Sequence, residues 1–440
     1  MKVVVIGGGW AGCAAALAAV KQGAEVTLIE RTDMLLGTGL VGGIFRNNGR
    51  FTAAEEAIAM GGGELFQLMD ANSVHRNIEF PGHKHASLYN ITSMEPAVVQ
   101  LLRRHGVELK MSTRISEVAL NGRRLVAVMT GKEAEAERFD ADAFVETTGT
   151  SALPNVCHKY GNGCCMCVLR CHAFGSRVSI AGRAGIKEIT GKKGPQVGAM
   201  SGSCELVRDS LAPDVLDEMR RTGLAMRAIP SVDIDSSKLD RKACQQYTQA
   251  EYKSNVIVLD TGGAKLMTSF LPLHILRTVP GFENARFADP FGGGRGNSIR
   301  YVNMAPRNDA LKVEGLDNVF CGGEKAGLLV GHTEAIVTGT LAGYNAVRCA
   351  LGKELLVVPD SLALGDAIKH VREQMQTEKG LGMKFTFSGS VYFERMKQRD
   401  GYLLDIAEIR RRVAGAGLTD VFAQHSRAVA ARPAAVGAMA

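Results

Sequence analysis

The chain has 440 residues, 46% of them hydrophobic and 22% charged, which is typical of a globular protein too long for one ordinary core. We expect two or three packed domains. No uncharged apolar run approaches the roughly 18 residues of a membrane span, and no basic segment precedes the first apolar run. We therefore expect a cytoplasmic chain without membrane contact. The net charge of +7 permits nucleic acid binding without arguing for it.

The first thirty residues follow the pattern strand, glycine-rich turn, helix, strand. Lys2–Ile6 is apolar and β-branched, the turn Gly7-Gly8-Gly9-Trp10-Ala11-Gly12 follows, and an alanine-rich stretch leads to a second strand at 24–29. Glycines at 7, 9 and 12 allow a tight turn, close approach to a pyrophosphate and close helix packing, and Glu30 stands where an acidic residue binds ribose. The segment therefore predicts a dinucleotide site.

Later segments show how the rest of the chain is organised. Residues 107–130 predict a small antiparallel excursion that turns at Asn121-Gly122, and Ala143–Glu146 returns to the main sheet. Strands are predicted at 177–180 and 256–259, and a helix at 212–222. A strand at 318–321 leads into Gly322-Gly323, a helix is expected over 335–351, and the helical pattern continues from 360 to about 421.

Both nicotinamide and flavin dinucleotides use a turn like that at 7–12, but two later segments favour the flavin. The segment Glu146-Thr147-Thr148-Gly149-Thr150 ends one strand with small residues, and Cys321-Gly322-Gly323-Glu324 ends another. Both patterns bring backbone close to an extended ligand. We therefore predict bound FAD, and the candidate cofactor-binding residues are Gly7, Gly9, Trp10, Ala11, Gly12, Glu30, Arg31, Gly149, Gly323, Glu324 and Glu334.

These elements predict an α/β fold with a Rossmann-like FAD-binding domain of the glutathione-reductase type. Its two parts are expected at 1–150 and 271–360, on either side of an inserted α+β substrate domain at 151–270. A helical C-terminal region at 361–425 and a disordered tail at 426–440 complete the predicted organisation.

Ten cysteines are many for a chain without a secretion signal, and five of them cluster. Cys157, Cys164, Cys165, Cys167 and Cys171 fall within 15 residues. Cys157, Cys164, Cys167 and Cys171 are candidate ligands of an iron-sulfur cluster, because the last three have ferredoxin-like spacing. A zinc site, a redox dithiol that exchanges with the flavin, and a set of small buried residues are the alternatives that the spacing leaves open.

Several segments resemble the GidA and TrmFO group of FAD-dependent tRNA-modifying proteins. The stretch 276–285, the turn at 318–323 and Gly331-His332-Thr333-Glu334 match segments of that group, and Thr147-Thr148-Gly149-Thr150 is similar to its TTGT turn. Arg46-Asn47-Asn48-Gly49-Arg50 occupies the place of its asparagine-containing loop beside the flavin. The resemblance covers roughly residues 1–60, 92–150 and 270–375, and it implies bound FAD with Asn47, Arg50 and His332 near the reacting face.

The chain departs from this group at one reactive position. The folate-dependent tRNA methyltransferases have a reactive cysteine in the loop before the asparagine, whereas this chain reads Ile44-Phe45-Arg46-Asn47. We therefore predict an oxidoreductase, forming a homo-oligomer, that transfers hydride between FAD and a small-molecule substrate. The candidate catalytic residues are His332, Asn47, Arg50, Cys164 and Cys167, and Arg46 and Arg50 are candidates to hold an anionic group.

Two alternatives remain open. A flavin-dependent RNA-modifying enzyme would keep the nucleic acid role of the group, although nucleic acid binding is not favoured here. A FAD and iron-sulfur electron-transfer subunit would use the cysteines at 157–171.

Overall fold

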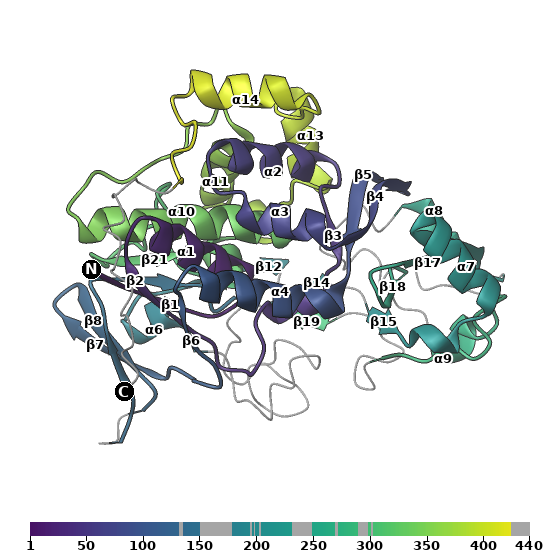
Figure 1. Cartoon of the computed structure of the whole chain (residues 1–440), viewed down its shortest axis with the longest axis horizontal. Coiled ribbons are helices and arrows are strands. Elements are labelled where there is room, and N and C mark those ends of the chain that lie inside the picture. The colour runs from purple at the N-terminus through teal and green to yellow at the C-terminus, as the bar shows by residue number, and fades with distance from the viewer. Residues whose placement is uncertain are drawn as a thin grey trace, which may run out of the picture.

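A computed structural model describes residues 1–131, 135–149, 178–193, 196–197, 199–201, 204–230, 249–268, 272–288, 298–300 and 302–423. The chain forms a larger body and a smaller lobe beside it (Figure 1). The body is built on a parallel sheet of order β21-β10-β1-β2-β6. Its strands are β1 (Lys2–Ile6), β2 (Glu25–Ile29), β6 (Glu108–Lys110), β10 (Ala143–Glu146) and β21 (Val319–Cys321).

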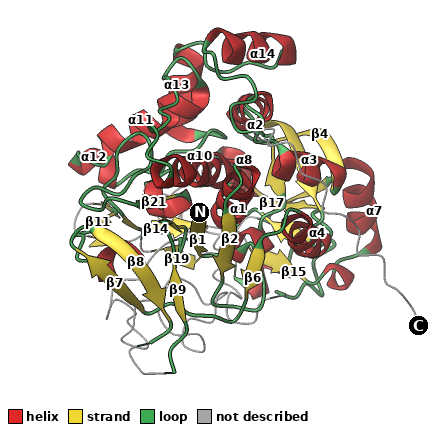
Figure 2. Cartoon of the chain, turned by 60° about the vertical axis from the view of Figure 1, so that its left-hand side comes forward, coloured by secondary structure: helices red, strands yellow, loops and turns green. Residues whose placement is uncertain are grey.

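Two helices with small residues at their contact cover one face of this sheet. They are α1 (Trp10–Lys21) and α10 (His332–Ala350), which run side by side in Figures 1 and 2. A Cβ atom at Gly339 would lie 2.1 Å from the Ala11 carbonyl oxygen, and one at Gly343 would lie 2.1 Å from that of Ala15. The backbones therefore approach more closely than any larger residue permits.

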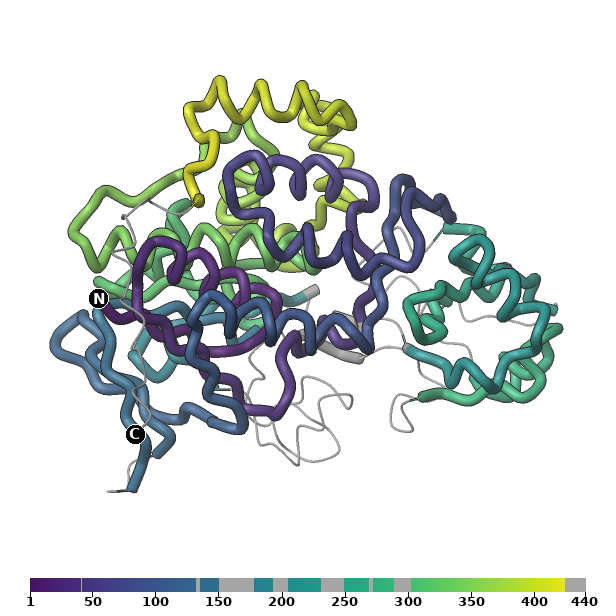
Figure 3. The backbone as a smooth tube through the Cα atoms, in the orientation of Figure 1, coloured from purple at the N-terminus to yellow at the C-terminus, as the bar shows by residue number. Residues whose placement is uncertain are grey.

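A helical layer from both ends of the chain lies beyond α10. The early helices are α2 (Gly49–Ala59) and α3 (Glu64–Ala71), and the late ones are α11 (Ala363–Gln374), α12 (Glu378–Leu381), α13 (Ser390–Gln398) and α14 (Ile406–Gly415). Figure 3 shows the yellow end of the chain over the purple segment that contains α2. The Phe422 N–H donates to the Met60 carbonyl at 2.7 Å, so the end of this region closes on the start of the body.

The smaller lobe is an antiparallel sheet of order β15-β18-β17-β16, packed against helices on one face. Leu206, Val258 and Leu266 point to a core shared with the helices. The alternate residues Ile257 and Leu259 face the body and pack with a three-stranded sheet. The lobe elements are β15 (Cys204–Leu206), α7 (Pro213–Thr222), β16 (Leu224–Ala228), α8 (Ala250–Ser254), β17 (Asn255–Leu259), β18 (Ala264–Leu266) and α9 (Leu273–Leu276).

Smaller sheets connect these layers. The three-stranded sheet that meets the lobe has order β3-β5-β4, and a meander has order β7-β8-β9. The strands and one further helix are β3 (Ile44–Phe45), β4 (Ser73–Phe80), β5 (His83–Tyr89), α4 (Ile91–Arg104), β7 (Glu117–Asn121), β8 (Arg124–Met129) and β9 (Arg138–Asp140). The short pairs are β11 (Ile189–Thr190) with β20 (Asn303–Met304), β12 (Lys192–Lys193) with β13 (Gln196–Val197), and β14 (Ala199–Ser201) with β19 (Ser298–Arg300).

The predicted fold class, a Rossmann-like α/β body with a further α+β unit and a helical C-terminal region, is confirmed. One element differs, because the strand expected at 177–180 gives way to the helix α6 (Ile180–Arg183). The Glu146 carboxylate accepts hydrogen bonds from the Ile180 and Ala181 N–H groups, at 2.8 Å each, and so fixes the start of that helix.

The predicted domain boundaries stay predictions, although two packing facts bear on them. Ile180 lies within the predicted insertion and belongs to the core of the body, whereas Ala285 lies beyond 270 and belongs to the core of the lobe. The expected tail at 426–440 lies outside the described residues. Within the described part of the chain, no helix has both the length and the apolar character to cross a bilayer.

Candidate functional site

The glycine turn after β1 is fixed by two kinds of contact. Gly7 has φ of +102°, and a Cβ there would lie 2.5 Å from the Thr147 carbonyl oxygen. A Cβ at Gly12 would lie 1.8 Å from the Gly7 oxygen, so the helix packs directly on the turn. Thr147 Oγ1 donates to that same oxygen at 2.7 Å. The ends of β1 and β10 are thereby held together at one edge of the sheet.

Gly9 is different, because the space beside it is open. It has φ of −67°, and a Cβ at this position would meet no atom within 4 Å. It is also the N-cap of α1, and no side chain caps that helix start. Uncapped N–H groups at a helix N-terminus, with bare backbone in front of them, are suited to bind an anion such as pyrophosphate.

Glu30 follows β2 and lies beside the turn. Its Oε2 accepts a hydrogen bond from the Gly8 N–H at 2.7 Å, and its Oε1 accepts from the Thr32 N–H at 2.9 Å. The carboxylate is therefore held in one orientation at the strand end. This is the position at which an acidic residue binds the ribose hydroxyls of a dinucleotide.

The glycines at 322 and 323, which follow β21, are required for the packing of that strand against two helices. Gly323 has φ of +65°, its N–H donates to Thr338 Oγ1 at 2.9 Å, and a Cβ there would lie 3.1 Å from the Ala11 Cβ. A Cβ at Gly322 would lie 3.1 Å from the Gly339 Cα. Both glycines thus let β21 meet α1 and α10, and a ligand contact at Gly323 or Glu324 stays a prediction.

The remaining predicted cofactor contacts lie near this edge. Arg31 directly follows Glu30, and Gly149, with φ of +71°, follows the end of β10. The Ala11 carbonyl faces Gly339, so it serves helix packing.

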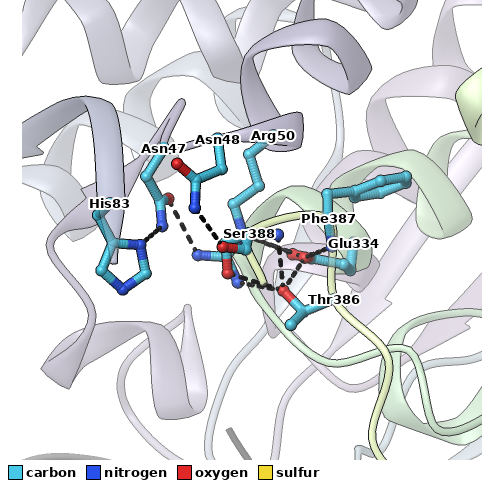
Figure 4. A network of polar contacts seen from close by, with 8 residues as sticks. All are labelled: Asn47, Asn48, Arg50, His83, Glu334, Thr386, Phe387 and Ser388. Carbon is cyan, nitrogen blue, oxygen red and sulfur yellow. Dashed lines mark hydrogen bonds and ion pairs between the residues drawn. The ribbon is translucent and has the colours of Figure 1, made fainter. Parts of the chain in front are cut away.

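A second group of polar residues surrounds Arg50 at the start of α2 (Figure 4). Arg50 Nε donates to both Glu334 carboxylate oxygens, at 3.0 and 3.1 Å. Its Nη1 donates to Asn47 Oδ1 at 3.2 Å and its Nη2 to Thr386 Oγ1 at 3.1 Å. Glu334 is fully buried and also accepts from Thr386 Oγ1 and the Phe387 N–H, so its carboxylate is engaged by the chain itself. Any effect of Glu334 on a cofactor would therefore pass through Arg50.

Asn47 extends this network to His83 in the β4–β5 hairpin. Arg50 can only donate, so the atom of Asn47 that it meets is the amide oxygen, and the amide nitrogen then donates to His83 Nδ1 at 2.8 Å. Burial, reinforced by Arg50, lowers the pKa of His83 to about 3. His83 is therefore a neutral ring with its proton on Nε2.

Arg46, which was also a candidate to hold an anion, points elsewhere. Its Nη1 donates to Glu55 Oε1 at 2.5 Å, and its Nε and Nη2 donate to the Asp70 carboxylate at 2.8 and 2.6 Å. Its guanidinium also lies 5.7 Å from the centroid of the Phe51 ring. These partners already supply its counter-charges, so the anion-binding role predicted for Arg46 is corrected to a structural one.

His332 begins α10 on the side of the network nearer the glycine turn. Its Nδ1 lies 3.2 Å from the Tyr89 hydroxyl, and its ring centroid lies 6.1 Å from that of Trp10. A Cβ at Gly42 would lie 1.8 Å from His332 Cε1, so glycine is required there to leave room for the imidazole. The structure thus places His332, Asn47 and Arg50 around the start of one helix.

The residues present fit FAD at this place. Gly9 offers the open backbone that a pyrophosphate needs, and two helices, α1 and α10, begin there without side-chain caps. Thr333 in the first turn of α10 is buried, and its Oγ1 finds no hydrogen-bond partner in the described chain. Such an atom calls for a ligand or ordered water.

The cysteine predictions fall on another part of the chain. Cys157, Cys164, Cys165, Cys167 and Cys171 lie outside the described residues, so both the thiol and the iron-sulfur predictions stay predictions. In the part that is described, no group of three or more histidine, cysteine or acidic side chains is placed to hold a metal ion. Burial raises the pKa of Cys321 to about 12, so this thiol, next to Gly322, is unreactive.

Sequence reasoning missed Tyr89, His83 and Thr386. Tyr89 and His83 lie in a hairpin whose one sequence signal is the turn Pro81-Gly82, and Thr386 lies between α12 and α13. No sequence motif links any of the three to the other site residues, because each reaches the site only through the tertiary fold.

Comparisons with known proteins agree with this geometry. Residues 2–157 match the model of the FAD dependent oxidoreductase family, and residues 223–354 match that of glucose inhibited division protein A. The TrmFO tRNA (uracil-5-) methyltransferase of Paramagnetospirillum magneticum is 31% identical over 153 residues, 35% of this chain and 31% of the relative. By these matches the chain is similar to the GidA/TrmFO-like family of FAD-dependent oxidoreductases. This confirms the resemblance found in the sequence.

Two further relatives match different shares of the chain. The tRNA uridine modification enzyme MnmG of Chlorobaculum tepidum is 29% identical over 139 residues, 31% of this chain and 21% of that enzyme. The form II crystal structure of Aquifex aeolicus GidA superposes with a TM-score of 0.63 at 16% identity, over 95% of this chain and 73% of that one, and it shows a shared fold. The sequence matches thus span a third or less of these two curated relatives.

Proposed function

We propose that the protein is a FAD-dependent oxidoreductase whose flavin reacts beside the start of α10. The observation that carries the proposal is the open backbone of Gly9 at an uncapped helix start, next to the fixed carboxylate of Glu30. When bound, FAD supplies the capacity to accept or donate hydride. The chain's own residues bind and orient it.

The residues divide this work by position. The N–H groups at the start of α1 would bind the pyrophosphate, and Glu30 would bind the adenosine ribose. The N-terminus of α10, with Arg50 beside it, would offer positive potential to the part of a flavin that becomes negative on reduction. Glu334 and Asn47 hold Arg50 in place. A small-molecule substrate and a homo-oligomeric state remain part of this proposal.

Replacing Gly9 with alanine tests the cofactor site without disturbing the fold. The new methyl group would meet no protein atom within 4 Å, and the backbone angle suits alanine, so the variant should fold normally. It would, however, stand where the pyrophosphate must approach. We expect wild-type protein to bind FAD, seen in its visible absorbance, and G9A to bind it about tenfold more weakly or worse, about 1.4 kcal/mol.

Gly415 provides the matched control, because a Cβ there also meets no atom within 4 Å and the residue ends the distant helix α14. G415A should bind FAD like the wild type, and circular dichroism should show all three proteins folded. Wild-type protein that takes up no FAD when it is supplied would overturn the proposed function. Equal FAD affinity of folded G9A and wild type would overturn the assigned pyrophosphate position.

RNA modification is the second candidate, and the comparisons favour it. The names of both curated relatives describe enzymes that act on tRNA. Against transfer of the TrmFO chemistry, the loop before Asn47 reads Ile44-Phe45-Arg46 and holds no thiol. RNA that copurifies with the protein, or binding to unmodified tRNA whose affinity falls steeply as salt rises, would support this candidate. If the protein does not bind tRNA at low salt, RNA modification is excluded and the small-molecule reaction is the remaining candidate.

A further inference from the structure

The contact between Tyr89 and His332 determines more than the position of the imidazole. Tyr89 ends β5 and is fully buried, and its hydroxyl lies 3.2 Å from His332 Nδ1. A neutral imidazole has one nitrogen with a proton and one without, so the direction of this hydrogen bond decides which nitrogen is which.

The surroundings of Tyr89 favour the hydroxyl as donor. Burial raises the pKa of Tyr89 above its usual range, although the Gly43 N–H and the Trp10 indole act in the opposite direction. The phenol therefore keeps its proton at every working pH. The described contacts give the buried Tyr89 hydroxyl one hydrogen-bond partner, His332 Nδ1, and a buried O–H without an acceptor is costly, so the hydroxyl is the donor in this contact.

Two further features oppose a positive charge on His332. It is the first residue of α10, where the helix dipole is positive. Arg50 is close by, because a Cβ at Gly331, the residue before His332, would lie 2.1 Å from Arg50 Nη2. An imidazolium there would face both positive potentials and would also have to displace the Tyr89 hydrogen from Nδ1.

We propose that Tyr89 is a positioning residue that holds His332 as a neutral imidazole with its proton on Nε2. His332 then serves the flavin site as a hydrogen-bond donor through Nε2 and not as a base. This narrows its predicted role as a catalytic residue. The inference rests on the proposed function only in assigning that donor to the flavin site.

The titratable and charged groups around this pair come from four elements. Tyr89 belongs to β5, Arg50 to α2 and Glu334 to α10 itself, and the Glu205 carboxyl on β15 acts on Tyr89 through its charge. Glu334 is bound to Arg50 at 3.0 Å and does not bond to the imidazole in the described contacts, and Arg50 still acts as a positive charge on its neighbours Tyr89 and His83.

The ¹⁵N chemical shifts of the His332 ring nitrogens, measured by nuclear magnetic resonance of ¹⁵N-histidine-labelled protein, show which nitrogen is protonated, and no substrate is needed. The full-length protein, loaded with FAD, would be recorded from about pH 5.5 to 8, the range in which an ordinary histidine titrates. The signal of His332 is the one lost in His332→Gln. We expect Nδ1 to appear unprotonated and Nε2 protonated across the whole range, with no shift between the end points.

Tyr89→Phe removes the hydroxyl and keeps the ring, so His332 should then titrate within this range or populate both tautomers. Tyr402→Phe, which changes a tyrosine packed on Phe393 in the C-terminal region, should leave the His332 signal unchanged. A wild-type His332 with its proton on Nδ1, or doubly protonated at pH 7, would overturn the proposal even if Tyr89→Phe fails to fold. Absorbance of the same sample reports FAD separately, so failure of the proposed function is distinguishable.

Discussion

The buried carboxyl of Glu205 should lower the stability of the folded protein by an amount that depends on pH. Glu205 lies on β15 beside Leu206, which points into the lobe core, so the Glu205 side chain points toward the body. Both its carboxylate oxygens are buried and find no hydrogen-bond partner in the described chain. Burial raises its pKa from 4.5 to about 7, although Lys265, its partner across the strands, opposes this rise.

The sign of the resulting pH dependence follows from that rise. Below pH 4.5 the carboxyl is protonated in both the folded and unfolded states, whereas between 4.5 and about 7 it ionises only on unfolding. The folded state should therefore lose up to about 3 kcal/mol of stability relative to the unfolded state as pH rises through this window. Glu205→Gln should flatten this dependence, as measured by urea unfolding at pH 5 and pH 8.

Glu354→Gln, at an exposed position, is the control and should unfold with the wild-type pH dependence. If Glu205→Gln and wild type lose the same stability between the two pH values, the carboxyl is ionised and partnered in the folded protein. The buried Glu56 differs in kind, because it accepts hydrogen bonds from the Ala363 and Leu364 N–H groups at 2.9 and 3.0 Å.

At the residue scale, the sequence predicted the site correctly where the spacing of residues is typical of one structure, as in the glycine turn. Gly7, Gly12 and Glu30 lie at the sheet edge in the arrangement that the turn implied. It failed where a side chain's partner is distant in the chain. Nothing local distinguishes Arg46 from Arg50, yet one binds Glu55 and Asp70 while the other binds Glu334, 284 residues away.

The contact of α1 with α10 is the critical packing between elements. Alanine is the better helix former by about 1 kcal/mol, so Gly343→Ala would stabilise α10 if the contact were loose. A Cβ there would lie 2.1 Å from the Ala15 oxygen, and such overpacking costs roughly 1–3 kcal/mol or more. We therefore expect net destabilisation, measured as a lower midpoint of urea unfolding.

G415A again serves for comparison, since its Cβ meets nothing within 4 Å and it should leave the midpoint unchanged or raise it slightly. A Gly343→Ala protein as stable as the wild type would mean that the two helices can separate without loss, contrary to the packing described here.

At the element scale, hydrophobic periodicity predicted most strands of the parallel sheet and the helices α1, α7 and α10, but not α2 or α4. The strand predicted at 177–180 was wrong, because a helix begins at Ile180. Glu146, at the end of β10, fixes that helix start by accepting a hydrogen bond from the Ile180 N–H. The β4–β5 hairpin turns at Pro81-Gly82, a turn signal that was not used, and its irregular register breaks the alternation expected of paired strands.

The whole molecule should become more stable when FAD binds, because the proposed site joins residues near 9 with residues near 332. A ligand that binds only the folded state adds about 2.7 kcal/mol at a concentration 100 times its Kd. We expect the unfolding temperature of the wild-type apoprotein to rise with added FAD and that of G9A to rise less. An unfolding temperature independent of FAD would contradict a site built from both ends of the chain.

At this scale, the body's parallel sheet takes strands from both sides of residues 151–270, while the predicted domain boundaries stay predictions. The sequence did not predict that residues 49–62 are covered by residues 363–422, since that contact rests on apolar faces with no recognisable pairing signal.

The tight seam between α1 and α10 also bears on how the protein is made. Nearly all of α1 is buried, and α10 supplies much of its cover, yet more than 300 residues separate the two helices along the chain. At synthesis rates of about 5–20 residues per second, α1 emerges tens of seconds before its partner. During that interval the face of α1 that α10 covers has no native neighbour to pack against, although β1, β2 and α4 are already present. Final packing of this part of the body therefore has to wait until α10 has been made.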